Sequence, residues 1–434
     1  MATVIKKLFF AAMAMFIILS DATAADRFPR PDFNETKHTY PVVQHVQARP
    51  VVFEYVDTAV LLACLILAVL ALKSRSRRWL SLLAVFSVIY FGFYRKGCVC
   101  PVGSLQNMAQ GICQSDFFVP AVVVLFFTIP LIFALFFGRV FCAAVCPLGS
   151  LQETVLVRPV RIPAWLEKPL RFIPLAYLLL AVLLAATGSA YIICQFDPFI
   201  SLFRLNGVFN ILVLSGCFIG LSLFIGRPYC RFICPYSVLL NLCSKFSGWH
   251  TSITPDKCVK CGLCKNACPY GAITVPEKAD SESDASSRKR RLKIFLMILP
   301  VLILLGIWGG YLSAAPLSGL NKTVQTADAL RSLQKDKGPW ESDLVAAFRQ
   351  LGAMDSDLYA RADSIRRQFA IGASAAGGFL GLILGLQLVG MNIRRKQDEY
   401  LPDRGLCFSC GRCHSYCPRE QLRLKKLKEE KNAG

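Results

Sequence analysis

The sequence predicts an all-α polytopic membrane protein, with about seven transmembrane helices after a signal peptide, that carries a small α+β module. Three observations predict this class. Of the 434 residues, 54% are hydrophobic, which is more than soluble domains normally contain. The apolar residues form runs long enough to cross a bilayer as helices, which takes about 17–25 residues. Finally, one cysteine pattern occurs twice in polar segments of the second half of the chain.

Residues 1–24 are predicted to be a secretory signal peptide. Lys6 and Lys7 precede the apolar run Leu8–Leu19, and Ala22-Thr-Ala24 follows it. A charged start, a short apolar core and a small-residue exit are typical of such signals; an uncleaved anchor is the alternative. Residues 25–50 are then a polar N-terminal segment, which we expect in the periplasm.

Seven candidate spans follow the signal, and the first five belong to a membrane domain over residues 51–250. The seven spans are Val51–Leu72, Trp79–Tyr94, Phe117–Phe137, Phe172–Ile193, Val208–Ile225, Ile294–Leu312 and Ile371–Met391. The polar stretch 277–293 is expected to be a flexible linker. Between the sixth span (294–312) and the seventh (371–391), residues 313–370 are expected to form a periplasmic helical insert because apolar residues recur there at helical spacing.

The distribution of positive charge predicts the orientation of the chain. The basic clusters Lys73–Arg78, Arg288–Arg291 and Arg394–Lys396 all fall on the inner side when the spans alternate, as the positive-inside rule requires. The net charge of +21 is therefore attributed to cytoplasmic loops and not to nucleic-acid binding. We expect a multi-pass protein of the bacterial inner membrane with its C-terminus in the cytoplasm.

The strongest motif is C-x2-C-x2-C-x3-C-P, which occurs in residues 251–276 and again in residues 392–434. Its cysteines are Cys258, Cys261, Cys264 and Cys268, and Cys407, Cys410, Cys413 and Cys417. Bacterial ferredoxins bind 4Fe-4S clusters with this run, and its fourth cysteine binds the other cluster of a pair. We therefore predict a two-cluster ferredoxin-like module with crossed ligands. Cluster one is bound by Cys258, Cys261, Cys264 and Cys417, and cluster two by Cys407, Cys410, Cys413 and Cys268.

Two other metal-binding interpretations of these runs remain open. Four cysteines at such spacing also bind structural zinc. Cys410-Gly-Arg-Cys413-His414 matches the C-x-x-C-H signature of covalent haem, although haem attachment belongs to the outer compartment.

A second motif, C-x3-C-P, follows the third and the fifth span. It contains Cys142 and Cys146 after Gly138-Arg139, and Cys230 and Cys234 after Gly226-Arg227. The four thiols are interpreted as ligands of a further metal or cluster at the membrane, as two redox thiol pairs, or as small hydrophobic packing residues.

A degenerate third copy is expected on the outer side of the membrane. Cys98 and Cys100 introduce Pro101-Val-Gly-Ser-Leu-Gln106, which resembles Pro147-Leu-Gly-Ser-Leu-Gln152. Together with the nearby Cys113 and Cys194, these cysteines form either an outer redox centre or structural disulfides in an oxidising compartment.

Paired C-x3-C-P motifs after membrane spans, followed by two ferredoxin runs, resemble the NosR/NapH family of membrane polyferredoxins. The resemblance is closest to the membrane half of NosR-type proteins, in residues 95–106, 138–152 and 226–235. It implies electron supply to periplasmic respiratory enzymes. NosR-type proteins also carry a periplasmic FMN domain. Residues 25–50 are too few for one, so we expect no FMN domain in this chain.

These patterns predict a membrane-bound iron–sulfur protein that transfers electrons. Its expected partners are a cytoplasmic electron donor or the quinol pool on one side and a periplasmic reductase or flavoprotein on the other. No catalytic residues are predicted, so the chain is expected to be a component of an oxidoreductase system and not a stand-alone enzyme. The alternative is a redox-sensing maturation or regulatory factor for a periplasmic metalloenzyme.

Overall fold

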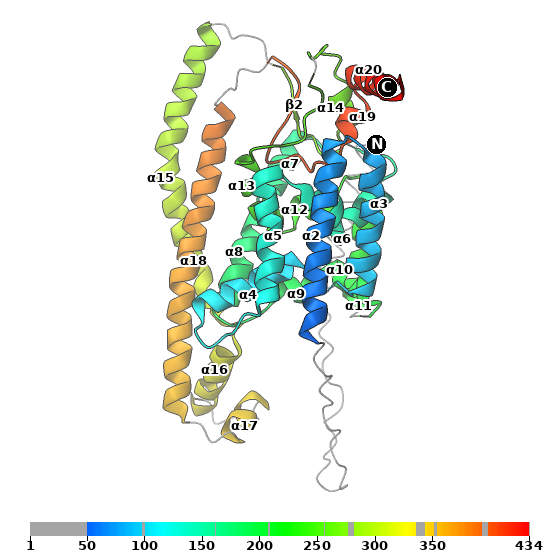
Figure 1. The fold of residues 1–434 in the computed structure, drawn as a ribbon. Helices are drawn as coiled ribbons and strands as arrows, with labels where there is room; N and C mark the ends of the chain where they lie inside the picture. Colours follow the sequence, from blue (N-terminus) through cyan, green and yellow to red (C-terminus); the bar gives the residue numbers. More distant parts are fainter. Residues whose placement is uncertain are drawn as a thin grey trace.

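The computed structural model describes residues 50–97, 100–160, 162–206, 209–255, 257–276, 282–335, 343–350, 354–392 and 398–433. The predicted signal peptide, the segment up to residue 49, and Cys98 lie outside the described residues. The described chain is mostly helical and has two short strands (Figure 1).

A bundle of helices and short helical turns forms the membrane domain. Its elements are α2 (Val51–Lys73), α3 (Arg77–Ser87), the π-helix η1 (Val88–Tyr94), α4 (Pro101–Cys113), α5 (Ala121–Phe137), the π-helix η2 (Phe141–Val145), α6 (Pro147–Val155), α7 (Ala164–Leu170), α8 (Ile173–Ala186), α9 (Ile192–Phe196), α10 (Pro198–Arg204), α11 (Phe209–Ser222), α12 (Pro228–Phe232) and α13 (Tyr236–Lys245). Proline starts α4, α6, α10 and α12, which suits a residue without a backbone N–H. The cysteine motifs thus lie at the breaks between apolar helices.

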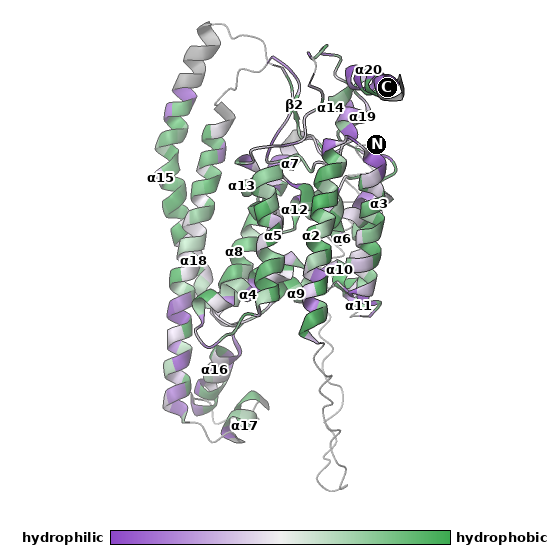
Figure 2. Ribbon diagram, viewed as in Figure 1, coloured by the Kyte–Doolittle hydropathy of each residue, from purple (hydrophilic) through white to green (hydrophobic). Residues whose placement is uncertain are grey.

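Within the described part of the chain, four helices are long and apolar enough to cross a membrane: Val51–Lys73, Trp165–Ala186, Arg290–Ser318 and Asp355–Gly390 (Figure 2). A fifth is counted if Pro198–Arg204 and Phe209–Ser222, which meet at 103°, form one broken span. The structure therefore supports fewer full-length spans than the seven predicted. The predicted second span divides into α3 and η1, and the third is a helix of only 17 residues.

Two long helices form an antiparallel hairpin beside the bundle, α15 (Glu282–Ser318) and α18 (Asp355–Asn392) (Figure 1). Glycines allow their backbones to touch, because a Cβ added at Gly310 or at Gly377 would collide with a carbonyl of the opposite helix. The hairpin packs on α8 through an apolar cluster that includes Leu183 and Phe369.

The sequence assigned residues 277–293 to a linker, but α15 already begins at Glu282. That part of the expectation is corrected. In the sequence, α16 (Lys322–Lys335) and α17 (Asp343–Gln350) come between the two long helices. They lie at the end of the molecule away from the ferredoxin runs (Figure 1).

The two ferredoxin runs come together at the other end of the molecule. The module consists of α14 (Leu263–Ala267), β1 (Ile273–Thr274), β2 (Leu401–Pro402), α19 (Arg412–Ser415) and α20 (Pro418–Ala433). The strands pair antiparallel, with Ile273 opposite Pro402. Apolar residues of this module, including Tyr270 and Phe408, belong to the same buried core as Phe141 and Tyr229 of the membrane domain. The module is therefore packed onto the bundle and not merely tethered to it.

Candidate functional site

The two cysteine runs fold in the same way. In each run, the residue before the second cysteine and the glycine after it have positive φ: Lys260 (56°) and Gly262 (73°), and Ser409 (51°) and Gly411 (73°). In both runs the amide of the first of these residues donates a hydrogen bond to the sulfur of the first cysteine at 3.4 Å. A loop that wraps its amides around sulfur is suited to stabilise negative charge there.

Each run contributes to two cavities, and in each cavity the fourth cysteine comes from the other run. Cys258, Cys261, Cys264 and Cys417 line the first cavity, of about 480 Å³ including its open mouth. Cys407, Cys410, Cys413 and Cys268 line the second, of about 360 Å³. The structure therefore groups the eight cysteines in the crossed sets that the sequence predicts.

The donor sets suit a polynuclear cluster better than a single ion. Across the described ranges, no three His, Cys, Asp or Glu side chains converge closely enough to bind one metal ion. A zinc site would need four sulfurs at about 2.3 Å from one point. Four thiols that surround a cavity without meeting at one point are instead arranged as ligands of a cluster that has a separate iron for each of them.

The two cavities differ in depth. Cys261 of the first cavity is exposed, whereas Cys407 and Cys410 of the second are half-buried. Phe408, also in the second cavity, is buried against the membrane domain. The first cavity is thus accessible to a soluble partner, and the second faces the membrane thiols.

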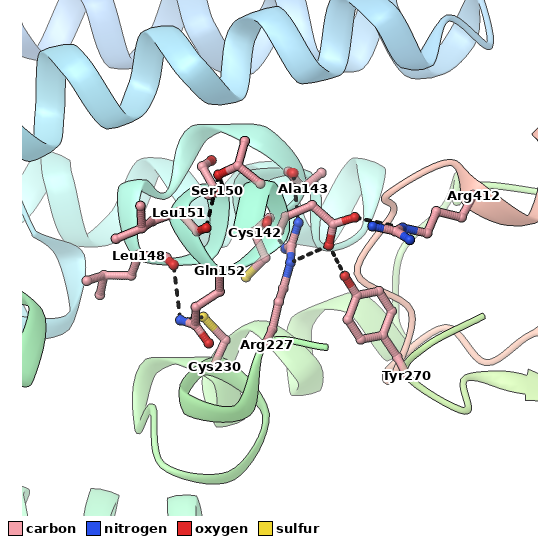
Figure 3. Close-up of polar contacts among 12 residues, drawn as sticks. Cys142, Ala143, Leu148, Ser150, Leu151, Gln152, Arg227, Cys230, Tyr270 and Arg412 are labelled. Carbon is pink, nitrogen blue, oxygen red and sulfur yellow. Dashed lines mark hydrogen bonds and ion pairs between the residues drawn. The ribbon is translucent and has the colours of Figure 1, made fainter. Parts of the chain in front are cut away.

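Two buried arginines connect the second cavity with the C-x3-C-P cysteines. The guanidinium carbons of Arg139 and Arg227 lie 4.0 and 5.5 Å from the ring centroid of Phe408. Arg139 Nη2 lies 3.9 Å from Cys142 Sγ. Arg227 donates to the carbonyl oxygens of Cys142 and, at 3.0 Å, of Ala143 (Figure 3). Arg139 and Arg227 belong to the Gly-Arg pairs that precede the two C-x3-C-P motifs. Each motif therefore supplies one arginine that contacts Phe408.

Arg139 is a buried cation, 2% exposed, that forms no ion pair with any described carboxylate. It donates to Gly405 O at 3.4 Å and to Ser237 Oγ at 3.0 Å, and its Nε has no partner among the described residues. Burying an unpaired charge costs several kcal/mol. Anionic thiolate ligands on both sides of Arg139, around Cys142 and around Cys407, would supply the missing countercharge. The chemistry of this site therefore fits iron–sulfur clusters.

Glu153 joins the membrane domain to both ferredoxin halves. Its carboxylate accepts from Arg227 Nε at 3.3 Å, from Arg412 Nε at 2.8 Å and from the Tyr270 hydroxyl. Figure 3 shows the polar ends of the Arg227, Arg412 and Tyr270 side chains directed toward one another. Burial alone would raise the pKa of this carboxyl, but the charges of Arg227 and Arg412 outweigh burial and hold its pKa below the ordinary value.

Replacing Glu153 with glutamine is expected to loosen the ferredoxin module from the membrane domain. The change leaves two buried guanidinium groups without their carboxylate, which typically costs about 3–5 kcal/mol. Thermal unfolding in detergent, followed by loss of the cluster absorbance, should therefore occur at markedly lower temperature. Asp363→Asn is the control, because it removes an exposed carboxylate partner of Arg366 at the opposite end and should leave the midpoint unchanged. Equal midpoints for the Glu153 variant and the wild type would contradict this account.

The four C-x3-C-P cysteines are buried and lie near one another. Each of Cys146 and Cys234 is close enough to Cys142 and Cys230 for their charges to interact. Gln152 connects the two repeats, because its Nε2 donates to Cys230 Sγ at 3.4 Å and its Oε1 accepts from the backbone amide that precedes this cysteine, at 3.1 Å. The structure thus brings both pairs into one group.

Of the four cysteines predicted on the outer side, the structure brings two together. Cys100 starts α4, and Cys194 in α9 lies beside the first turn of that helix, with its sulfur 3.2 Å from a Cβ built on Gly103. Cys113 ends α4, about 20 Å of helix further along. Cys98 lies outside the described residues.

Four functional candidates, Arg139, Arg227, Glu153 and Asp197, do not follow from the sequence analysis. Arg139 and Arg227 appear there only as the residues of the Gly-Arg pairs that precede the C-x3-C-P cysteines. Glu153 and Asp197 do not appear there. The signal for Asp197 was present, because Cys194-Gln-Phe-Asp-Pro198 parallels Cys230-Arg-Phe-Ile-Cys-Pro235 with a carboxylate in place of the second thiol.

Comparisons with known proteins agree with these sites. A family described as "4Fe-4S binding domain" matches residues 118–167 and 208–254, which contain both C-x3-C-P motifs. A second family with the same description matches residues 251–274, which contain the first ferredoxin run. No solved structure matches the chain. An iron–sulfur electron-transfer role follows from these matches and from the relatives described next.

Relatives include an uncharacterized protein and a putative electron transport protein. The uncharacterized protein MJ0750 of Methanocaldococcus jannaschii is 31% identical over 205 residues, which are 45% of this chain and 82% of the relative. The putative electron transport protein YccM of Escherichia coli is 28% identical over 189 residues, 39% of this chain and 52% of the relative.

The regulatory protein NosR of Pseudomonas aeruginosa is 26% identical over 233 residues, which are 48% of this chain and 32% of that protein. The chain therefore spans most of one relative but only half of YccM and a third of NosR. The chain belongs to the NosR/NapH-type family of membrane polyferredoxins.

Proposed function

We propose that this protein conducts electrons across the bacterial inner membrane through a series of iron–sulfur centres. A cytoplasmic donor or the quinol pool reduces a module with two 4Fe-4S clusters, and a periplasmic reductase or flavoprotein is oxidant on the other side. The crossed cysteine sets bind the two clusters, with Cys258, Cys261, Cys264 and Cys417 in the first cavity. The second cavity uses Cys268 and the remaining three cysteines of the second run.

One observation carries this proposal: the second cavity contacts the membrane thiols through side chains and not through solvent. Phe408, which lines that cavity, packs against Arg139, and Arg139 reaches Cys142 Sγ at 3.9 Å. A ferredoxin module that only sensed redox state would need no buried contact of this kind. The exposed Cys261 at the first cavity supports entry of electrons there, so that the second cluster is the exit.

The four C-x3-C-P cysteines form the next centre in this proposal. They are buried and grouped, and they lie beside two arginines, of which Arg139 has no carboxylate partner among the described residues. The "4Fe-4S binding domain" description of the matching family supports an iron–sulfur cluster over redox-active thiol pairs. When bound, such a cluster would exchange single electrons. The residues of this chain hold it, shield it from water and set its charge.

The test replaces Cys142 and Cys230 with serine, singly and together. Protein purified anaerobically in detergent is analysed for iron and acid-labile sulfide, and for EPR signals before and after dithionite. We expect the wild type to contain more iron than the eight atoms of two cubanes, and the variants to lose the excess while both ferredoxin signals remain. Only eight irons in the wild type, with unchanged signals in the variants, would overturn the membrane centre.

A second candidate, redox sensing for maturation or regulation of a periplasmic metalloenzyme, is favoured by one observation. The relative from Pseudomonas aeruginosa is named a regulatory protein. In that case the clusters should be reduced and oxidised without any electrons leaving at the periplasmic face. Wild-type rates of outward electron transfer that disappear in the Cys142 variant would decide against this candidate.

A further inference from the structure

The membrane domain contains four similar cysteine units, at Cys100, Cys146, Cys194 and Cys230. Cys146 pairs with Cys230 and Cys100 with Cys194, and the two pairs face opposite ends of the molecule. The first unit follows η1 with Cys100-Pro101, and the second follows α5 with Cys146-Pro147. The α3–η1 pair and α5 run in opposite directions, so α4 lies further from the ferredoxin strands than α6 does (Figure 1). Membrane proteins built from inverted repeats often place equivalent binding sites at the repeat interface.

The equivalence extends to individual hydrogen bonds. Gln152, six residues after Cys146, accepts at Oε1 from the backbone amide of Tyr229 at 3.1 Å, and Cys230 follows. Gln106, six residues after Cys100, accepts at Oε1 from the backbone amide of Ile193 at 3.0 Å, and Cys194 follows. Each glutamine therefore accepts a hydrogen bond from the backbone of the residue just before the cysteine with which its own unit is paired, Cys230 or Cys194.

The thiols occupy equivalent places as well. A Cβ built on Gly149 would lie 3.8 Å from Cys230 Sγ, and one built on Gly103 would lie 3.2 Å from Cys194 Sγ. Each glycine comes three residues after its proline-linked cysteine, in the first turn of α6 or α4. Because glycine has no side chain, the sulfur of Cys230 can approach the start of α6, and the sulfur of Cys194 can approach the start of α4.

Asp197 stands where the inner site has Cys234. Both residues precede a proline that starts the next helical segment, and both are preceded by a cysteine, Cys194 or Cys230, within four residues. Asp197 is 2% exposed. One carboxylate oxygen accepts from the Phe199 amide at 2.9 Å. The other, Oδ2, is buried, and the carboxylate also interacts with the Tyr229 side chain.

We propose that Cys100, Cys194 and Asp197 are ligands of an outer iron–sulfur cluster, in which the Asp197 carboxylate stands where the inner site has the Cys234 thiolate. Cys194 and Asp197 each lie close enough to Cys100 to interact electrostatically with its sulfur. These donors do not converge on one metal ion in the described structure, and the ferredoxin cavities show the same property. Thiolate with carboxylate is a donor set for iron and not for a hard cation such as Mg²⁺.

The outer cluster rests on the proposed function and extends it, because it would be the centre from which electrons leave the membrane domain. Cys146 and Cys234 of the inner site are each close enough to Cys100 for their charges to interact. The order of centres is then the first ferredoxin cavity, the second cavity, the inner site and the outer site. An external oxidant would take electrons near α4 and α9.

The test measures iron in detergent-purified protein grown on 57Fe, by Mössbauer spectroscopy, for the wild type and the variants Cys194→Ser, Asp197→Ala and Asp197→Cys. We expect Cys194→Ser and Asp197→Ala to lose the iron of one cluster while the ferredoxin and inner-site signals persist. Asp197→Cys places a thiol where the inner site has Cys234, so it should retain all the iron with an altered spectrum. Cys113→Ser is the control at the same end of the molecule and should retain all iron.

Two results would overturn the outer cluster. One is unchanged iron in both Cys194→Ser and Asp197→Ala. The other is a disulfide between Cys100 and Cys194, found by mass spectrometry of the anaerobically purified wild type. If instead the wild type holds no iron beyond that of the ferredoxin module, the proposed membrane pathway fails as well, so the two failures are distinguishable. A global loss of all clusters in Asp197→Ala signals misfolding, and Asp197→Cys then decides.

Discussion

Replacing Cys417 with alanine is expected to remove the cluster of the first cavity and to leave the cluster of the second. Cys417 lies beside Cys413 in the chain, yet it lines the cavity formed by Cys258, Cys261 and Cys264. A cluster that loses one of four thiolate ligands is held poorly, because ligand geometry and count set its retention. Iron should fall by about four atoms, and the interaction between two reduced clusters should vanish from the EPR spectrum.

Double variants show which cluster has been lost. In the Cys417→Ala background, Cys261→Ala should cause no further loss of iron, because it removes a ligand of the cluster already missing. Cys410→Ala should remove the remaining cluster. The opposite pattern would show that each run binds its own cluster and would contradict the crossed arrangement. Cys243→Ala, a half-buried cysteine outside every motif, should leave iron and spectra unchanged.

Replacing Arg139 with glutamine is expected to lower the reduction potentials of the centres on both sides of it. The buried guanidinium lies between Phe408 of the second cavity and Cys142 of the membrane group. Removing a unit charge at about 8 Å, with an effective dielectric constant of about 20, changes the energy of a reduced centre by roughly 2 kcal/mol. For a one-electron couple this is on the order of 100 mV.

Redox titration monitored by EPR measures this shift. Arg139→Lys keeps the charge and should retain most of the potential, which separates electrostatics from the packing of the guanidinium on Phe408. Arg331→Gln is the control, since Arg331 is an exposed residue of α16 far from the cysteines. Unchanged midpoint potentials in Arg139→Gln would contradict the placement of two charged centres around this residue.

The cysteine pattern predicts the ferredoxin module well because spacing in these runs reflects cluster geometry directly. Three thiols within seven residues can reach one cavity only if the loop between them turns tightly, and Gly262 and Gly411 provide that turn with φ of 73°. The crossed assignment of Cys268 and Cys417 rests on the known ferredoxin pattern, and each of these cysteines lines the cavity of the opposite run.

Hydropathy predicts the membrane helices less well, because it counts apolar residues and does not see where a helix breaks. The predicted second span contains a change from α3 to the π-helix η1, and Ser87 at that change bonds the carbonyl of Val145 in the neighbouring motif. Tertiary contacts of this kind shorten helices around the cysteine motifs. They depend on partners far away in the chain, which a local pattern does not reveal.

The polar contacts between the two modules could not be predicted from the sequence for a related reason. Arg139 and Arg227 stand beside apolar spans, where basic residues commonly mark the cytoplasmic boundary. Nothing in the local sequence distinguishes a solvated boundary arginine from one packed on an aromatic ring. Glu153 likewise becomes a connection only when Tyr270 and Arg412, from separate halves of the ferredoxin module, meet at its carboxylate.

Electron transfer through the membrane in reconstituted vesicles tests the central claim most directly. The protein is inserted in liposomes that enclose ferricyanide, an impermeant oxidant, and dithionite is added outside to molecules whose ferredoxin module faces outward. Reduction of the enclosed ferricyanide should follow at a rate proportional to the amount of protein and should cease in Cys142→Ser, although the ferredoxin clusters of that variant still become reduced. Equal rates of ferricyanide reduction in Cys142→Ser and the wild type would contradict a path through the membrane thiols.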